Sequence, residues 1–290
     1  MIRLNPDRIA EQKIQQLMNA RNNRPDPEMG GLSPNQVYRL INLPWEHPDF
    51  PIKFNKQLKL FDIKDSVFFT NPRVFLQTLL EFENEDTATA KGNLNRKFVK
   101  AVFDRLVLKR ETKADILRFN KVINEEDVMP LHVARIVCEE ARLIQCRKRK
   151  FLLTSKGKEL LPEEKAGKLF YELFNSYFRE LNIGYVDRFP DLESLQHTIA
   201  YSFCRLSEIA DRFVAIGRLF DEIFLPAVEN EIRKVFADVL RLDWLVRSRV
   251  VKPLEDFGLV ECKYKHFKAY SEIEAVRKKK LFDRFMQVEW

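Results

Sequence analysis

The chain has 290 residues, of which 45% are hydrophobic and 32% are charged, and its formal net charge is +7. This composition is typical of a globular protein with room for two domains, and it excludes a fully disordered chain. The basic excess permits nucleic-acid binding, while a count of only 8 glycines argues against sandwiches, barrels and glycine-rich phosphate loops.

Residues 1–31 are predicted to form an N-terminal helix and a linker. Apolar residues recur at helical spacing over residues 5–20, at Ile9, Ile14, Leu17 and Met18. The Pro and Gly residues that follow, up to Gly31, are typical of a connecting segment. An isolated helix of this length is marginal in water. We therefore expect residues 5–20 to pack on the body, on a second copy of the chain or on a partner protein.

Residues 32–161 are predicted to form the first domain. Ser33 and Gln36 have the spacing of a capping box, with Pro34 at the first helical position. Asn93 or Asn95 is expected to cap a helix whose buried side carries Phe98, Val99, Val102, Phe103 and Leu106. Pro130 begins a further helix that runs to Arg142, and a basic hairpin is expected over residues 143–154.

Residues 162–242 have helical periodicity and are predicted to form a helical middle segment. Residues 243–290 are predicted to form a second module. Its expected elements are a helix over residues 246–257, a hairpin over residues 259–271 and a terminal helix near residues 272–286.

The two predicted hairpins are copies of one pattern. Leu143 to Phe151 aligns without a gap on Leu259 to Phe267, 116 residues further along the chain. Side chains alternate between the two faces of a strand, so each copy has one apolar and one basic face. We expect Cys146 and Cys262 to pack inward, and the largely cationic tips to project into solvent.

The junctions around both hairpins carry a family resemblance. Ala141-Arg142-Leu143-Ile144, the basic hairpin and Leu153-Thr154-Ser155-Lys156-Gly157 resemble winged helix-turn-helix domains of bacterial regulators, and Phe257-Gly258-Leu259-Val260-Glu261 is similar to the same junction. The first hairpin, with Gly31 to Gln36 and Thr89 to Leu94, also resembles uncharacterised bacterial proteins, some of them relatives of plasmid open reading frames. These resemblances imply a mainly α fold with small β-hairpins, in which a helical segment joins two winged-helix-like modules.

In winged-helix domains the helix before the hairpin enters the major groove. The first copy is expected to present His132, Arg135, Glu139 and Glu140, whose carboxylates are unfavourable beside phosphates. The second copy is therefore the better candidate, because Arg can contact guanine with two hydrogen bonds. The predicted DNA-binding residues are Arg247, Ser248, Arg249, Lys252, Lys263, Lys265 and Lys268 in the second copy, and Arg147, Lys148, Arg149 and Lys150 in the first. Pro253 is the one residue of the second helix that disturbs this assignment of faces.

No catalytic, cofactor or metal-binding pattern stands out. The four His residues are scattered, the four Cys residues form no C-x-x-C pair, and common catalytic and phosphate-binding motifs are missing. No apolar run approaches the roughly 20 residues that span a bilayer. We expect a non-enzymatic cytoplasmic protein that binds duplex DNA, as a transcriptional regulator or a mobile-element-associated factor, without cofactor, metal or membrane. The alternative is an interaction scaffold whose winged helices dock a partner protein.

Overall fold

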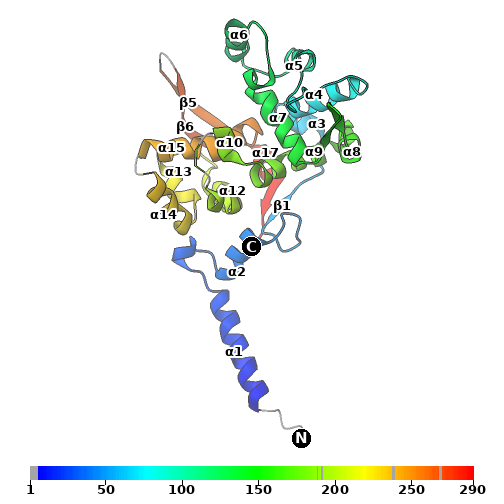
Figure 1. Cartoon of the computed structure of the whole chain (residues 1–290). Coiled ribbons are helices and arrows are strands. Elements are labelled where there is room, and N and C mark those ends of the chain that lie inside the picture. Colours follow the sequence, from blue (N-terminus) through cyan, green and yellow to red (C-terminus); the bar gives the residue numbers. More distant parts are fainter. Residues whose placement is uncertain (1–5, 188, 191, 237–238, 268–269) are drawn as a thin grey trace.

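A computed structural model describes residues 6–187, 189–190, 192–236, 239–267 and 270–290. The fold is mainly helical with small antiparallel sheets, as predicted (Figure 1). Among the described residues, no helix is long and apolar enough to cross a membrane.

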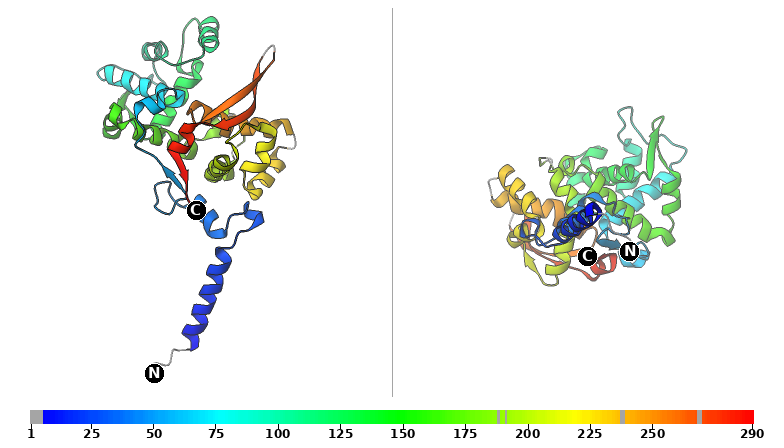
Figure 2. Two further views of the ribbon diagram at one scale, coloured as in Figure 1. Left: turned by 180° about the vertical axis from the view of Figure 1, so that it is seen from behind. Right: turned by 90° about the horizontal axis from the view of Figure 1, so that it is seen from below.

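The N-terminal helix α1 (Pro6–Asn22) forms as predicted but projects away from the body (Figure 1). Its apolar side chains Ile14, Leu17 and Met18 are 58%, 71% and 54% exposed. Of the surfaces expected to cover this helix, the body is therefore excluded, because the connection through η1 (Pro27–Met29) directs the helix outward (Figure 2). After that connection, α2 (Pro34–Asn42) begins with the predicted capping box of Ser33 and Gln36.

Removal of residues 1–22 is expected to change the oligomeric state and to leave the melting temperature nearly unchanged. The three exposed apolar side chains of α1 contribute little to the stability of the body, and a second copy or a partner is what remains to cover them. Light scattering and thermal melts of the full and shortened chains test this. An unchanged mass would contradict an association role for α1.

The first unit of the body runs from α4 to α8. Its elements are α4 (Val67–Glu81), α5 (Arg96–Phe103), α6 (Arg110–Phe119), η2 (Glu125–Asp127), α7 (Met129–Glu140), β2 (Ile144–Arg147), β3 (Lys150–Leu153) and α8 (Ser155–Leu160). Asn95 caps α5 through its side chain, as predicted, and the apolar face of that helix is buried. The amide of Ala88 donates to the carbonyl of Arg149, so a short extended segment lies beside the hairpin.

The first hairpin has the predicted bounds, and Ile144 pairs with Leu153 in register. Lys148 and Arg149 both have positive φ, as a two-residue hairpin turn requires. Cys146 is exposed, so its predicted inward packing is wrong. Burial falls from Ile144 toward Arg147 because the strand extends beyond the helices that cover its first residue.

The second unit likewise consists of helices, a hairpin and a short final helix, with an additional strand after its first helix. Its elements are α12 (Ile199–Ile209), β4 (Val214–Ala215), α13 (Ile216–Ile223), α14 (Pro226–Val235), α15 (Val239–Val246), η5 (Arg247–Val251), α16 (Lys252–Asp256), β5 (Val260–His266), β6 (Ser271–Lys278) and α17 (Lys280–Phe285). The strands form one antiparallel sheet in the order β4-β6-β5. Strand β4 lies within residues 162–242, for which the sequence predicted helices alone.

The second hairpin is longer than predicted. Its return strand continues to Lys278, and only Lys280–Phe285 of the predicted terminal helix is helical. Ile273 and Ala275 are buried while Glu272 and Glu274 face outward, which is the alternation of a strand. The ungapped alignment fails at Phe267, which lies in the longer loop and bonds to Tyr270, whereas Phe151 lies on a return strand.

The remaining elements join the two units around an aromatic core. They are β1 (Ile52–Phe54), α3 (Leu60–Ile63), η3 (Glu163–Lys165), α9 (Ala166–Asn175), the π-helical turn η4 (Ser176–Glu180), α10 (Ile183–Asp187), α11 (Glu193–His197) and β7 (Met286–Val288). Strands β1 and β7 pair antiparallel, which ties the chain before the first unit to the C-terminus. Phe257 of the second unit stacks on Phe68 of α4 at a centroid distance of 4.8 Å and packs against Phe174 of α9 at 5.1 Å, so one core holds both units together.

Candidate nucleic-acid interface

The helix before the second hairpin contains a π-helical turn at Arg247–Val251. The amide of Lys252 bonds to the carbonyl of Arg247, five residues earlier. Pro253 follows at once, and a proline has no N–H to donate to the preceding turn. The wider turn accommodates the proline and changes which side chains share a face.

Arg249 is turned inward by this geometry and is only 3% exposed. Its Nε donates to Asp187 Oδ2 at 2.7 Å, and its terminal nitrogen donates to Asp187 Oδ1 at 3.1 Å and to the Pro190 carbonyl at 2.9 Å. The predicted outward orientation of Arg249 is therefore wrong. Its guanidinium anchors the helix to α10 and the segment that follows it.

Arg247, Ser248 and Lys252 do share a surface, as predicted, and line a hollow of about 470 Å³. The hollow also takes Trp244 from α15, Tyr264 and His266 from β5, and Lys109 from the first unit. Sequence reasoning missed Lys109, because it precedes α6 and nothing local links it to a helix more than a hundred residues later. Trp244 is 57% exposed and offers an aromatic face beside these cations.

Two cations of this hollow are already paired with carboxylates. Arg247 lies 3.7 Å from Asp243 and 3.9 Å from Glu272. Lys252 Nζ donates to Glu255 at 2.9 Å and to Asp256 at 2.6 Å.

Burial opposes the charge on Lys252, but the two carboxylates raise its pKa overall, so the ammonium stays charged. A phosphate at this place must compete with these carboxylates.

The hairpin β5–β6 carries cations that are free of such competition. Lys263 and Lys265 are exposed, and among the residues that the structure describes neither forms an ion pair. Lys263 Nζ lies 4.2 Å from the ring centroid of Phe213, and Lys265 Nζ lies 5.3 Å from that of Phe267. Lys268 falls outside the described residues.

The corresponding helix of the first unit turns His132 and Arg135 inward, whereas Glu140 is exposed as predicted. Glu125 is 1% exposed, and its Oε1 lies 2.7 Å from His132 Nδ1 and accepts from Arg135 Nε at 2.5 Å. Its Oε2 accepts from the amide of Leu94 at 2.6 Å, and Arg135 also pairs with Glu139. The outward orientation predicted for His132 and Arg135 is therefore wrong. Burial opposes the charge on Glu125, but His132, Arg135 and the Leu94 amide lower its pKa overall.

The basic tip of the first hairpin lies apart from the second hairpin. Arg147, Lys148 and Arg149 are exposed, while Lys150 donates to the carbonyl of Asn84 at 3.0 Å. The green β2–β3 hairpin lies on one side of the body in Figure 1, and β5–β6 lies on the other. The two basic tips therefore form separate surfaces.

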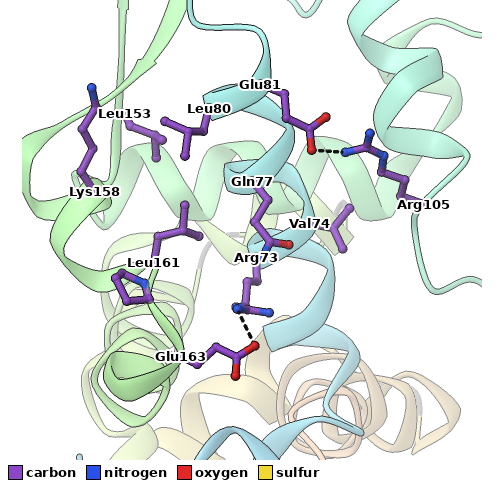
Figure 3. A pocket seen from close by; sticks show the side chains of 11 residues that line it. Arg73, Val74, Gln77, Leu80, Glu81, Arg105, Leu153, Lys158, Leu161 and Glu163 are labelled. Carbon is purple, nitrogen blue, oxygen red and sulfur yellow. Dashed lines mark hydrogen bonds and ion pairs between the residues drawn. The ribbon is translucent and has the colours of Figure 1, made fainter.

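The first unit also contains a hollow of about 730 Å³ beneath its hairpin (Figure 3). Val74, Leu80, Leu153 and Leu161 give it apolar walls. Its cations are paired at the rim, Arg73 with Glu163 and Arg105 with Glu81 at 3.6 and 2.8 Å. Lys158 is likewise paired with Glu83 at 2.6 Å. These pairs leave the hollow without an unpaired cation of its own among the side chains that line it.

Among the residues that the structure describes, no three His, Cys, Asp or Glu side chains gather as a metal site would require. No solved structure matches the chain. A family model described as the Y4jL N-terminal domain matches residues 71–168, which cover most of the first unit. An uncharacterised protein, y4jL of Sinorhizobium fredii, is 34% identical over 85 residues, or 29% of this chain and 37% of that protein. The match spans little more than a third of the length of y4jL.

Proposed function

We propose that the protein is a non-enzymatic duplex-DNA-binding protein, a transcriptional regulator or mobile-element-associated factor, that contacts DNA through its second unit. The observation that carries this proposal is the arrangement of that unit. In this unit α12 is followed by the short strand β4, then by helices α13 to α16, and then by the long hairpin β5–β6. The three strands form one sheet in the order β4-β6-β5. This arrangement is typical of winged-helix domains, in which the helix before the hairpin meets the major groove.

The charges of the second unit support contacts to phosphates. Lys263 and Lys265 on the hairpin make the larger contribution to phosphate binding, because within the described part of the chain neither is paired with a carboxylate that a phosphate would have to displace. Arg247, Ser248 and Lys252 meet the backbone or the base edges at the hollow, and Lys109 adds a cation from the first unit. The four cysteines are free thiols, which supports a reducing, cytoplasmic setting.

The proposal is tested by comparing the two hairpins on a labelled duplex of mixed sequence. Lys263→Ala with Lys265→Ala is expected to weaken binding by about tenfold or more at moderate salt, since two phosphate contacts and their released counterions are lost. Arg147→Ala with Lys148→Ala removes the same charge from the first hairpin and is expected to have the smaller effect. Fluorescence anisotropy gives both affinities.

A larger loss from the Arg147 and Lys148 variant would assign DNA binding to the first unit instead. No binding by the parent protein at low salt would favour the alternative, a scaffold that docks a partner protein. The observation that favours this alternative is the pairing of Arg247 and Lys252 with carboxylates, together with the exposed apolar stripe of α1.

A further inference from the structure

An apolar cavity lies between the two units and adjoins the proposed DNA surface. Its volume is about 690 Å³, within the range of sites that hold drug-sized ligands. Helices α4 and α7 of the first unit form one wall, and α10, η5 and α16 form the other. Its apolar lining includes Phe68, Pro72, Val133, Tyr177 and Val186. Val107 and Met129, which also line the cavity, are 49% and 44% exposed, so solvent reaches it there.

Lys109 is the cation of the cavity wall that a ligand can reach. Asp187 is paired with Arg249, and Lys252 is shared by Glu255 and Asp256. Within the described part of the chain no ion pair involves Lys109; its ammonium lies 5.6 Å from the ring centroid of Tyr264. A carboxylate near Lys109 would balance this charge.

Tyr177 adds a hydrogen-bond donor to the cavity wall. The residue is buried, and no side chain or backbone group of the described residues accepts from its hydroxyl. Burial and the nearby Asp256 raise its pKa, so the hydroxyl keeps its proton. A ligand oxygen inside the cavity would accept a hydrogen bond from this hydroxyl.

We propose that this cavity binds an amphipathic carboxylate, an aliphatic or aromatic acid, and that its bound head group competes with DNA for Lys109 and Lys252. The apolar body of the ligand lies against Phe68, Pro72 and Val133, and its carboxylate faces Lys109. Lys109, Ser248 and Lys252 line both this cavity and the hollow of the proposed DNA surface. The binding site stands on the cavity alone, while the competition rests on the proposed function.

Ligand binding is tested with decanoate below its aggregation concentration, by calorimetry on the full chain. Decanoate is expected to bind at least tenfold more tightly than decanol or decylammonium. Thr112 is exposed and lines the cavity, so the larger side chain of Thr112→Trp is expected to fill part of it and to weaken decanoate binding by tenfold or more. Ala114→Trp, at an exposed position on the opposite side of the same helix, should bind decanoate as the parent does. Equal affinities of these two variants would overturn the proposed site.

The role of Lys109 is tested by its replacement with alanine. Lys109→Ala is expected to weaken decanoate binding about tenfold and to leave the affinity for decanol unchanged. Lys121 is another exposed lysine of the first unit, and Lys121→Ala should change neither affinity. A similar decanoate affinity in both variants would overturn the assignment of the head group.

The competition is tested by titrating labelled duplex in the presence and absence of decanoate. Decanoate is expected to weaken DNA binding by the parent protein several-fold and to leave the Thr112→Trp variant unaffected. Unchanged DNA affinity at saturating decanoate would overturn the coupling. Tight decanoate binding by a protein that binds no DNA would overturn the proposed function and leave the cavity site standing. DNA binding by a protein that does not bind decanoate would overturn the cavity site and leave the proposed function standing.

Discussion

Replacing Arg249 with alanine is expected to lower the free energy of unfolding by about 3–5 kcal/mol, because the change leaves the carboxylate of Asp187 buried without its partner. The guanidinium makes two hydrogen bonds to that carboxylate and one to the carbonyl of Pro190. All of these are lost together in the variant. Urea denaturation followed by circular dichroism measures the change.

Lys265→Ala is the matched control, since it removes a charge of the same sign from an exposed position of the same unit. It is expected to change stability by less than about 0.5 kcal/mol. A second test replaces both partners, Arg249→Met with Asp187→Leu, which should recover much of the lost stability because neither charge remains buried. Stability near the parent value in the Arg249→Ala variant would show that the side chain does not hold the buried pair.

Replacing Glu125 with glutamine is expected to lower stability by about 3 kcal/mol at pH 7, because Arg135 and His132 lose the charge that they share. The folded state lowers the pKa of Glu125 below its unfolded value. Its carboxylate therefore stabilises the fold above the unfolded pKa, and this stability is lost as the pH falls through the folded pKa. The difference between parent and variant should thus shrink toward acid pH.

The control for this variant is Glu126→Gln, one residue further along. Glu126 is exposed, so removal of its charge should have a small effect at every pH. Urea midpoints of the parent and both variants, measured from pH 7 down to about pH 2, separate the two carboxylates. A Glu125→Gln difference that stays constant over this range would contradict a charge-based role.

Local patterns predicted the elements whose signals lie within a few residues. The caps at Ser33 and Asn95 depend on side chains that bond to amides three residues later, and both are confirmed. The first hairpin is confirmed for a similar reason, because strand alternation and a short turn define it. Such features need no information from distant parts of the chain.

The side chains of the candidate surface were harder to predict, because distant partners decide their orientation. Arg249 faces Asp187, 62 residues earlier, and a π-helical turn before Pro253 changes its direction. Glu125 lies in an acidic run that looks solvated, yet contacts with α7 bury it. The return strand of the second hairpin was predicted too early in the chain, because the repeat suggested that both hairpins have turns of the same length.

The central claim is that the second hairpin contacts DNA phosphates, and the salt dependence of binding tests it most directly. The affinity of parent protein and of the Lys263→Ala, Lys265→Ala variant for one duplex is measured over a series of salt concentrations. We expect the logarithm of the binding constant to fall linearly with the logarithm of the salt concentration for both proteins, with a slope that is smaller in magnitude by about 2 units for the variant. Parallel lines for the two proteins, or affinities that do not change with salt, would contradict it.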